Sequence, residues 1–123
     1  MSPHARSRLG SLGEDAAAAL LESKGFRIIA RNHRTRRGEV DLVADDGSLL
    51  AFVEVRTRAT DAFGGPAGSV NLRKQRRCVM AARDFLATWS GPERAIRFDV
   101  VAIVDAPSGP SLEHIPDAFP AEA

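Results

Sequence analysis

The sequence predicts a single α/β domain in which helices pack on a mixed central β-sheet. The predicted element order is α-β-β-β-α-β, followed by a short edge strand. Two segments carry apolar residues at helical spacing, and others show the alternating or continuous apolar residues of strands. The length of 123 residues fits one hydrophobic core rather than two. Residues 1–8 and 117–123 are expected to be flexible tails of the domain 1–123.

The first predicted helix spans residues 11–24. Its apolar residues recur at helical spacing, and Gly25 follows as a C-terminal stop. Ser11 and Glu14 have the spacing of a capping box, in which the glutamate bonds back to the cap residue. This explanation of Glu14 needs no function.

The next segments predict strands joined by a hairpin. Residues 26–31 are β-prone, and residues 39–45 alternate carboxylate and apolar positions. Asp46-Gly47 is a preferred dipeptide of type I′ turns, so strand 39–45 should fold back on strand 49–58. With this turn, positions that sum to about 93 oppose each other, which places Asp41 near Phe52 and diagonal to Glu54.

The second half predicts a loop, a helix and a buried strand. Residues 59–68 are rich in glycine and are expected to form a mobile loop. Asn71 can cap a helix whose buried stripe would be Val79, Ala82, Phe85, Leu86 and Trp89. Residues 96–104 form an apolar run typical of a strand covered on both faces, and residues 111–115 would add an edge strand. Asp99 lies inside the apolar run and needs a partner if it is buried, for which Arg97 or an arginine of the second helix would serve.

Composition narrows the classes of function. Hydrophobic residues make up 44% and charged residues 27%, as in an ordinary soluble domain. The early apolar runs are too short for a signal peptide or a membrane span, which predicts a cytoplasmic protein with no membrane partner. One cysteine and three dispersed histidines provide no zinc spacing, so any metal would need oxygen ligands.

The net charge of +1 is unevenly distributed. One basic block contains no acid and consists of Arg27, Arg31, Arg34, Arg36 and Arg37. A second block opens the second helix and consists of Arg73, Lys74, Arg76 and Arg77. Two solvated faces are the ordinary explanation of such runs, whereas phosphate binding is the functional one.

Asp41 and Glu54 are the candidates for a metal site. Residues two apart on a strand share a face, so Glu54 and Arg56 project together, and Asp41 projects from the neighbouring strand. Adjacent carboxylates repel unless a cation or proton neutralises them, and Mg²⁺ needs few protein oxygens because it keeps several waters. The alternative is a structural salt bridge to Arg56 or Arg58, which spacing and composition alone would favour.

Several short motifs occur together and in a fixed order: Gly13-Glu14, Arg31-Asn32, Gly38-Glu39-Val40-Asp41-Leu42, Phe52-Val53-Glu54-Val55-Arg56, Gly64-Gly65, Lys74, and Arg97-Phe98-Asp99-Val100-Val101. In this order the chain resembles the YraN family of small bacterial proteins almost end to end. That family is similar to archaeal Holliday-junction resolvases and PD-(D/E)xK nucleases. The resemblance implies a restriction-endonuclease-like core.

The resemblance also implies a site and an activity. Asp41, Glu54 and the backbone carbonyl of Val55 would bind Mg²⁺ or Mn²⁺, and Glu14 would be an outer acidic residue. The protein would be an endonuclease or resolvase-like enzyme that hydrolyses DNA phosphodiesters with a metal-activated water. The basic blocks would bind nucleic acid through Arg31, Arg34, Arg36, Arg37, Arg73, Lys74, Arg76 and Arg77.

The chain departs from the family pattern at Arg56, where a lysine is expected. A guanidinium can hold a phosphate bidentately but cannot give up a proton, so a general-base role of lysine is lost. Lys74 is a candidate substitute. A non-catalytic nucleic-acid-binding module is therefore the alternative function, and a protein-interaction domain with structural carboxylates is a third. The choice between DNA and RNA and the formation of a homodimer stay open.

Overall fold

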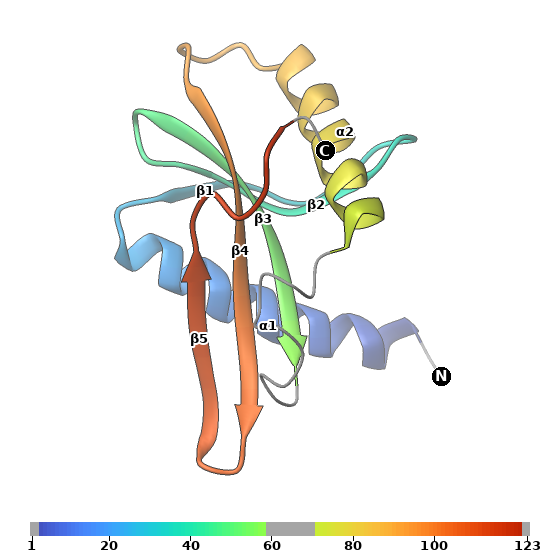
Figure 1. Cartoon of the computed structure of the whole chain (residues 1–123), viewed down its shortest axis with the longest axis vertical. Helices are drawn as coiled ribbons and strands as arrows, with labels where there is room; N and C mark the ends of the chain where they lie inside the picture. The colour runs from blue at the N-terminus through green and yellow to red at the C-terminus, as the bar shows by residue number, and fades with distance from the viewer. Residues whose placement is uncertain (1–2, 59–70, 122–123) are drawn as a thin grey trace.

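A five-stranded mixed sheet with the strand order β1-β2-β3-β4-β5 forms the centre of the fold (Figure 1). The computed structural model describes residues 3–58 and 71–121. The elements in this part are α1 (Pro3–Ser23), β1 (Arg27–Arg34), β2 (Glu39–Asp45), β3 (Leu49–Arg58), α2 (Leu72–Ala87), β4 (Ala95–Ala106) and β5 (Gly109–Ile115). The α/β class and the order of elements are confirmed. The expected loop of residues 59–68 lies outside the described residues.

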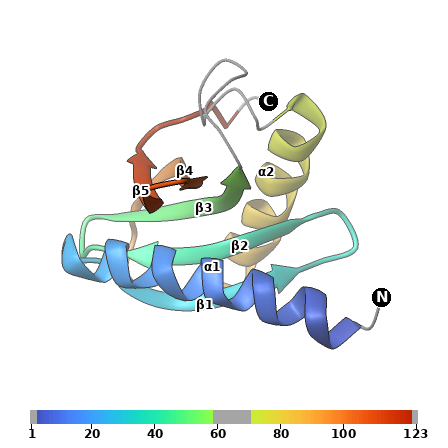
Figure 2. The ribbon, with the colours of Figure 1, turned by 90° about the horizontal axis from the view of Figure 1, so that it is seen from below.

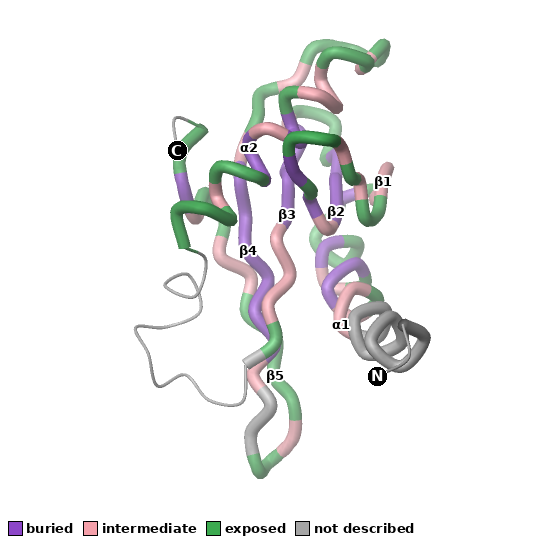
Figure 3. The backbone as a smooth tube through the Cα atoms, turned by 90° about the vertical axis from the view of Figure 1, so that its right-hand side faces the viewer, coloured by how far each residue is buried: buried purple, intermediate pink, exposed green. Residues whose placement is uncertain are grey.

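The two helices cover opposite faces of the sheet (Figure 2). On one face, Ala17 and Leu21 of α1 join a buried cluster that includes Val53 of β3. On the other face, Val79 and Ala82 of α2 join a cluster around Phe52. The central parts of β2, β3 and β4 are therefore buried, whereas β5 is largely exposed (Figure 3).

α1 begins eight residues before its predicted start. Proline suits the first helical turn because its missing N–H has no partner there in any case. Ser11 therefore lies inside the helix, and the predicted capping box between Ser11 and Glu14 is wrong. Residues 3–8, which were expected to belong to a tail, are helical.

The β2–β3 hairpin differs from its prediction by one position in the turn. Asp45 pairs with Leu50, and the Asp46 amide donates to the Leu49 carbonyl, so Gly47 and Ser48 are the central residues. Gly47 has a φ of 95°, the positive value that a type II′ turn requires at its first central residue. The side chain of Asp46 accepts hydrogen bonds from the amides of Ser48 and Leu49, which fixes it just outside the turn.

The shifted turn changes the partner of Asp41. Val43, not Asp41, pairs with Phe52, and Leu42 pairs with Val53. The paired register ends with Leu42 and Val53, so the predicted pairing of Asp41 with Phe52 is wrong. Asp41 and Glu54 are nevertheless neighbours, because the charge of Asp41 raises the pKa of Glu54.

β3 and β4 run parallel, and α2 lies between them in the chain. The predicted cap is confirmed, because the Asn71 side chain accepts a hydrogen bond of 2.9 Å from the Lys74 amide. The predicted apolar stripe of α2 is confirmed as well, since its members are buried or packed against the core. The predicted edge strand appears as β5, antiparallel to β4.

The C-terminal segment packs on the core where a tail was expected from residue 117. Phe119 is buried and stacks on Phe98, and the Ala118 amide donates to the Phe98 carbonyl. The Asp117 amide donates to Asp99 at 3.0 Å. Asp99 also binds Arg97, as predicted, so its role in the fold is structural.

Within the described residues, neither helix combines the length and the hydropathy needed to cross a membrane.

Candidate functional site

The site forms where β2 separates from β3. The β2–β3 ladder ends at Leu42 and Val53, and β3 continues beside β4 as far as Arg58. Just beyond the end of this ladder, the Val55 amide donates a 2.8 Å hydrogen bond to Oδ2 of Asp41. A side-chain oxygen thus accepts the amide proton that a strand carbonyl would otherwise accept. This bond holds the Asp41 carboxylate beside Glu54.

The backbone around Asp41 is irregular on both strands of the β1–β2 pair. Val40 packs in the α2 cluster and Leu42 in the α1 cluster, although residues two apart on a regular strand share a face. On β1, Asn32 lies in the corresponding position and has a φ of 49°, a left-handed value that asparagine tolerates better than most residues. The regular alternation of side chains between the two faces of β2 therefore breaks at Asp41. The Asp41 residue lies between one neighbour that packs against α2 and one that packs against α1.

Asp41 and Glu54 are carboxylates without an ion-pair partner among the described side chains. Burial, then the negative charges of Glu14 and Glu39, raise the pKa of Asp41 to about 6, and the Val55 hydrogen bond opposes this rise. Burial and the neighbouring Asp41 charge raise the pKa of Glu54 to about 8. Among the described side chains, no arginine or lysine forms an ion pair with either carboxylate. Their mutual repulsion is therefore an energetic cost that a bound cation would relieve.

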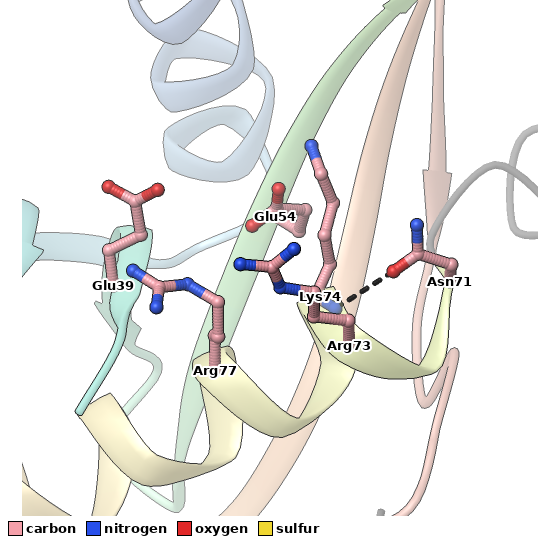
Figure 4. Close-up of a pocket in the computed structure, with 6 residues that line it drawn as sticks. All are labelled: Glu39, Glu54, Asn71, Arg73, Lys74 and Arg77. Atoms are coloured by element: carbon pink, nitrogen blue, oxygen red, sulfur yellow. Dashed lines mark hydrogen bonds between the residues drawn. The ribbon is translucent and has the colours of Figure 1, made fainter.

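A pocket of about 260 Å³ opens beside Glu54, under the first turns of α2. It is lined by Glu39, Glu54, Asn71, Arg73, Lys74 and Arg77. Figure 4 shows Arg73 and Lys74 extending from α2 toward Glu54, and Arg77 extending toward Glu39. The positive charge of Lys74 lowers the pKa of both Asp41 and Glu54, although it does not overcome their burial. The pocket therefore combines two strand carboxylates, Glu39 and Glu54, with three helix cations.

The donor set fits a magnesium-type ion. In residues 3–58 and 71–121 there is no group of three or more histidine, cysteine or acidic side chains that could enclose a metal. Mg²⁺ does not need such a group, because it keeps several waters and commonly takes one or two carboxylates. Asp41 and Glu54 are such a pair, and the backbone amide of Val55, the residue after Glu54, binds the Asp41 carboxylate.

Glu14 lies near this pair without joining it. Its Oε1 accepts a 2.8 Å hydrogen bond from Nδ2 of Asn32, which ties α1 to the irregular part of β1. Its charge acts on Asp41 by raising the carboxyl pKa. Gly13 beside it has a close neighbour, since a Cβ there would lie 3.2 Å from Cδ1 of Ile103. The Gly13-Glu14 motif therefore allows the helix to approach the end of the sheet.

Arg56 lies on β3 two residues beyond Glu54. Its Nε is buried and has no hydrogen-bond partner among the described residues. Its charge lowers the pKa of Glu54, but the two form no ion pair. The alternative of a structural salt bridge between Arg56 and these carboxylates is therefore not supported. The side chain of Arg58 lies outside the described part.

The first basic block differs from its prediction, because acids from other segments neutralise most of it. The pairs are Arg27 with Asp45, Arg31 with Asp15, Arg34 with Glu39, and Arg37 with Asp84. Only the second block contributes to the pocket, through Arg73, Lys74 and Arg77. Arg36 and Arg76 are exposed and do not line the pocket.

Sequence reasoning missed the roles of Gly38, Asn32 and Glu39. A Cβ on Gly38 would lie 1.9 Å from the backbone oxygen of Arg77, so only glycine lets the β1–β2 turn lie directly against α2. This contact brings Glu39 to the pocket rim. The glycine immediately before Glu39 was visible in the sequence, but nothing local indicated that α2 would cover it.

Comparisons with known proteins identify relatives over most of the chain. The model of an uncharacterised protein family, UPF0102, matches residues 13–103. A UPF0102 protein of Anaeromyxobacter dehalogenans is 55% identical over 114 residues, which cover 93% of this chain and 85% of that protein. UPF0102 proteins of Desulforapulum autotrophicum and Myxococcus xanthus are 44% and 42% identical, over 93% and 98% of this chain and 94% and 95% of their own lengths.

Proposed function

This chain belongs to the uncharacterised protein family UPF0102, and we propose that it is a metal-dependent nuclease that hydrolyses phosphodiester bonds of DNA in the cytoplasm. One observation carries the proposal. Asp41 and Glu54 are neighbours at the end of a strand pair and have raised pKa values, and a pocket with three cations opens beside Glu54. Perturbed acidic groups in a pocket are typical of functional sites.

Asp41 and Glu54 would hold Mg²⁺ or Mn²⁺, together with the Val55 carbonyl. When bound, the ion would supply an activated water and stabilise negative charge on the phosphate. The Val55 amide fixes the direction of the Asp41 carboxylate before any ion arrives. The protein therefore begins with the ligand geometry largely set and with a repulsion that binding relieves.

The basic side chains of the pocket would bind the phosphate. Arg73, Lys74 and Arg77 supply positive charge on the side of the pocket formed by α2. Arg56 has a buried Nε with an unused donor, and its charge acts on Glu54. Its guanidinium would pair with a phosphate oxygen and would not accept a proton during the reaction. Glu14 would not bind the phosphate. It would act on Asp41 through its negative charge and would hold Asn32 in place through their hydrogen bond.

Arg56 is also the observation that favours the alternative function, a nucleic-acid-binding module without efficient cleavage. Arg56 stands where the resembled family has a lysine, and a guanidinium stays protonated. The site therefore lacks one route for proton transfer. Lys74 is the other amine near the carboxylates, and its charge acts on both. The two functions therefore differ in chemistry rather than in the binding surface.

The test is to incubate the pure protein with branched, single-stranded and duplex DNA, and with RNA, in Mg²⁺, Mn²⁺ or EDTA. We expect cleavage that requires the metal and that Asp41→Asn and Glu54→Gln abolish. Arg56→Lys should retain or raise activity, and Arg56→Ala should give a lower activity than wild type. Asp15→Asn changes an exposed carboxylate outside the site and serves as the matched control.

The nuclease proposal would be wrong if neither wild type nor Arg56→Lys cut any of these substrates and Asp41→Asn left the affinity for Mg²⁺ unchanged. A second outcome would favour the binding module. In that case wild type and Arg56→Lys would bind nucleic acid without cutting it, and Asp41→Asn would lose affinity for Mg²⁺.

A further inference from the structure

We infer that the nucleic-acid backbone binds along the first two turns of α2, with one phosphate group in the pocket beside Glu54, and that the arginines of β1 and its following turn pair with carboxylates of the protein instead. The inference rests on the proposed function and assigns its binding surface. It divides the two basic blocks, which look equivalent in the sequence, into one that binds substrate and one that does not.

Most of the β1 block is already paired with carboxylates from α1, β2 and α2. Nη1 of Arg31 lies 2.5 Å from Oδ1 of Asp15, and Nε of Arg34 lies 3.3 Å from Oε2 of Glu39. Arg37 binds Asp84 of α2 through both Nε and Nη2. A phosphate that approached these arginines would have to displace a carboxylate, and would then lie beside that negative charge. The net attraction at this surface is therefore small.

The pairs of this block also have structural consequences. The Arg31–Asp15 pair joins β1 to α1, and the Arg37–Asp84 pair joins the β1–β2 turn to α2. The second pair lies close to Gly38, where the turn touches the backbone of α2 at Arg77. These arginines therefore connect the hairpin to both helices.

The α2 block has a different environment. Arg73, Lys74 and Arg77 form no ion pair with a carboxylate among the described residues, and all three are exposed. Residues four apart lie one above the other on a helix, so Arg73 and Arg77 extend along one side of the pocket. Neutralising phosphates with such cations releases counterions from the nucleic acid, which favours binding.

The orientation of α2 is fixed, so these cations extend from backbone positions beside the pocket. Cys78, Val79 and Ala82 are buried against the sheet, which sets the rotation of the helix. Asn71 caps the helix through the Lys74 amide, which fixes its first turn. Figure 4 shows the outcome, with the three side chains directed over the strands that carry Glu39 and Glu54. A phosphate in this pocket lies next to the carboxylate site.

The test compares single charge removals in the two blocks. A short mixed-sequence DNA duplex, fluorescently labelled, is titrated with protein in EDTA at several salt concentrations, and the affinity is read by anisotropy. Arg73→Gln and Arg77→Gln should each lower the affinity about threefold to tenfold and reduce the salt slope by about one. The matched changes Arg31→Gln and Arg34→Gln should leave the affinity within about twofold and the slope unchanged. Thermal unfolding of each variant confirms that it is folded.

Equal losses from both blocks, larger losses from the β1 block, or no binding by the wild type at low salt would each overturn the inference. Binding that depends on the α2 block in a protein that cuts no substrate would support the inference and remove only the catalytic part of the proposed function. A change of sequence in the duplex should not alter the ranking of the variants, since phosphates carry no sequence information.

Discussion

Two groups of carboxylates lie on the same sheet, the buried Asp99 and the half-buried pair Asp41 and Glu54, and they differ in their partners. Asp99 has no exposed surface, and it accepts hydrogen bonds from Arg97, the Asp117 amide and, at 2.8 Å, Nε2 of His114. Asp41 accepts one hydrogen bond from the Val55 amide, and Glu54 has no ion-pair partner among the described side chains. One carboxylate is therefore fully satisfied, whereas the other two are not.

The pKa values of the two groups move in opposite directions for this reason. Burial alone would raise the pKa of Asp99, but the bonds from Arg97, Asp117 and His114 outweigh it and hold that pKa below its usual range. Burial raises the pKa of Asp41 to about 6 and of Glu54 to about 8, because the nearby cations offset it only in part. A satisfied buried charge is typical of a structural role, whereas perturbed carboxylates beside a pocket are typical of functional sites.

The largest expected effect is at the satisfied carboxylate. Asp99→Asn leaves Arg97 and His114 without their charged partner inside the sheet, and we expect it to lower the free energy of unfolding by roughly 3–5 kcal/mol. Urea denaturation followed by circular dichroism measures this change. Asp15→Asn, which removes an exposed ion pair, should cost less than about 1 kcal/mol. If the two variants lost similar stability, the contrast between the carboxylate groups would fail.

The unsatisfied carboxylates should behave in the opposite way. In metal-free wild type, the folded pKa values of about 6 and 8 lie above the ordinary values of 3.8 and 4.5. Their contribution to stability is therefore fully present below about pH 4 and is lost as the pH rises through 6 and 8. Glu54→Gln removes this loss, so it should stabilise the protein by roughly 1–3 kcal/mol at pH 9 in EDTA.

Thermal unfolding between pH 4 and pH 9 checks this sign, because Glu54→Gln should flatten the fall in stability that wild type shows across this range. Asp99 gives the opposite dependence, since its lowered pKa means that stability is lost as the pH falls. A Glu54→Gln protein that is less stable than wild type at pH 9 would show that Glu54 contributes to the fold as Asp99 does.

The smallest expected effect concerns Lys74, the exposed cation that partly offsets the pair. Lys74→Met should lower stability at pH 9 in EDTA by less than about 1 kcal/mol, because an exposed charge acts weakly through solvent. At pH 4 the carboxylates are protonated and the same change should have no effect. The difference between the two pH values separates the electrostatic role of Lys74 from a general role in α2, and an equal loss at both would exclude the electrostatic role.

Local patterns in the sequence were sufficient for most of the fold. The apolar stripe of α2, the Asn71 cap and the buried strand around Asp99 each follow from residues near one another in the chain. Two boundaries were missed, the start of α1 and the β2–β3 turn, because neither is marked by apolar periodicity. Residues 3–10 have no apolar periodicity although they are helical, and the Asp46 side chain moves the turn to Gly47 and Ser48.

The candidate site was predicted in its carboxylates but not in its surroundings. Asp41 and Glu54 do come together, because both lie near the end of one hairpin. The partners of the β1 arginines come from α1 and α2, so no run of sequence indicates that Asp15 and Asp84 neutralise them. The same holds for Gly38, whose contact with Arg77 depends on how α2 crosses the sheet.

The most direct test of the central claim is the binding of Mg²⁺, measured by isothermal titration calorimetry at pH 8 for wild type, Asp41→Asn, Glu54→Gln and the control Asp15→Asn. If Asp41 and Glu54 form an incomplete cation site, wild type and Asp15→Asn should bind the ion with equal affinity, and the other two variants should lose at least tenfold. Mn²⁺ should give the same ranking. Undiminished binding in Asp41→Asn and Glu54→Gln, or no binding by the wild type, would contradict the account.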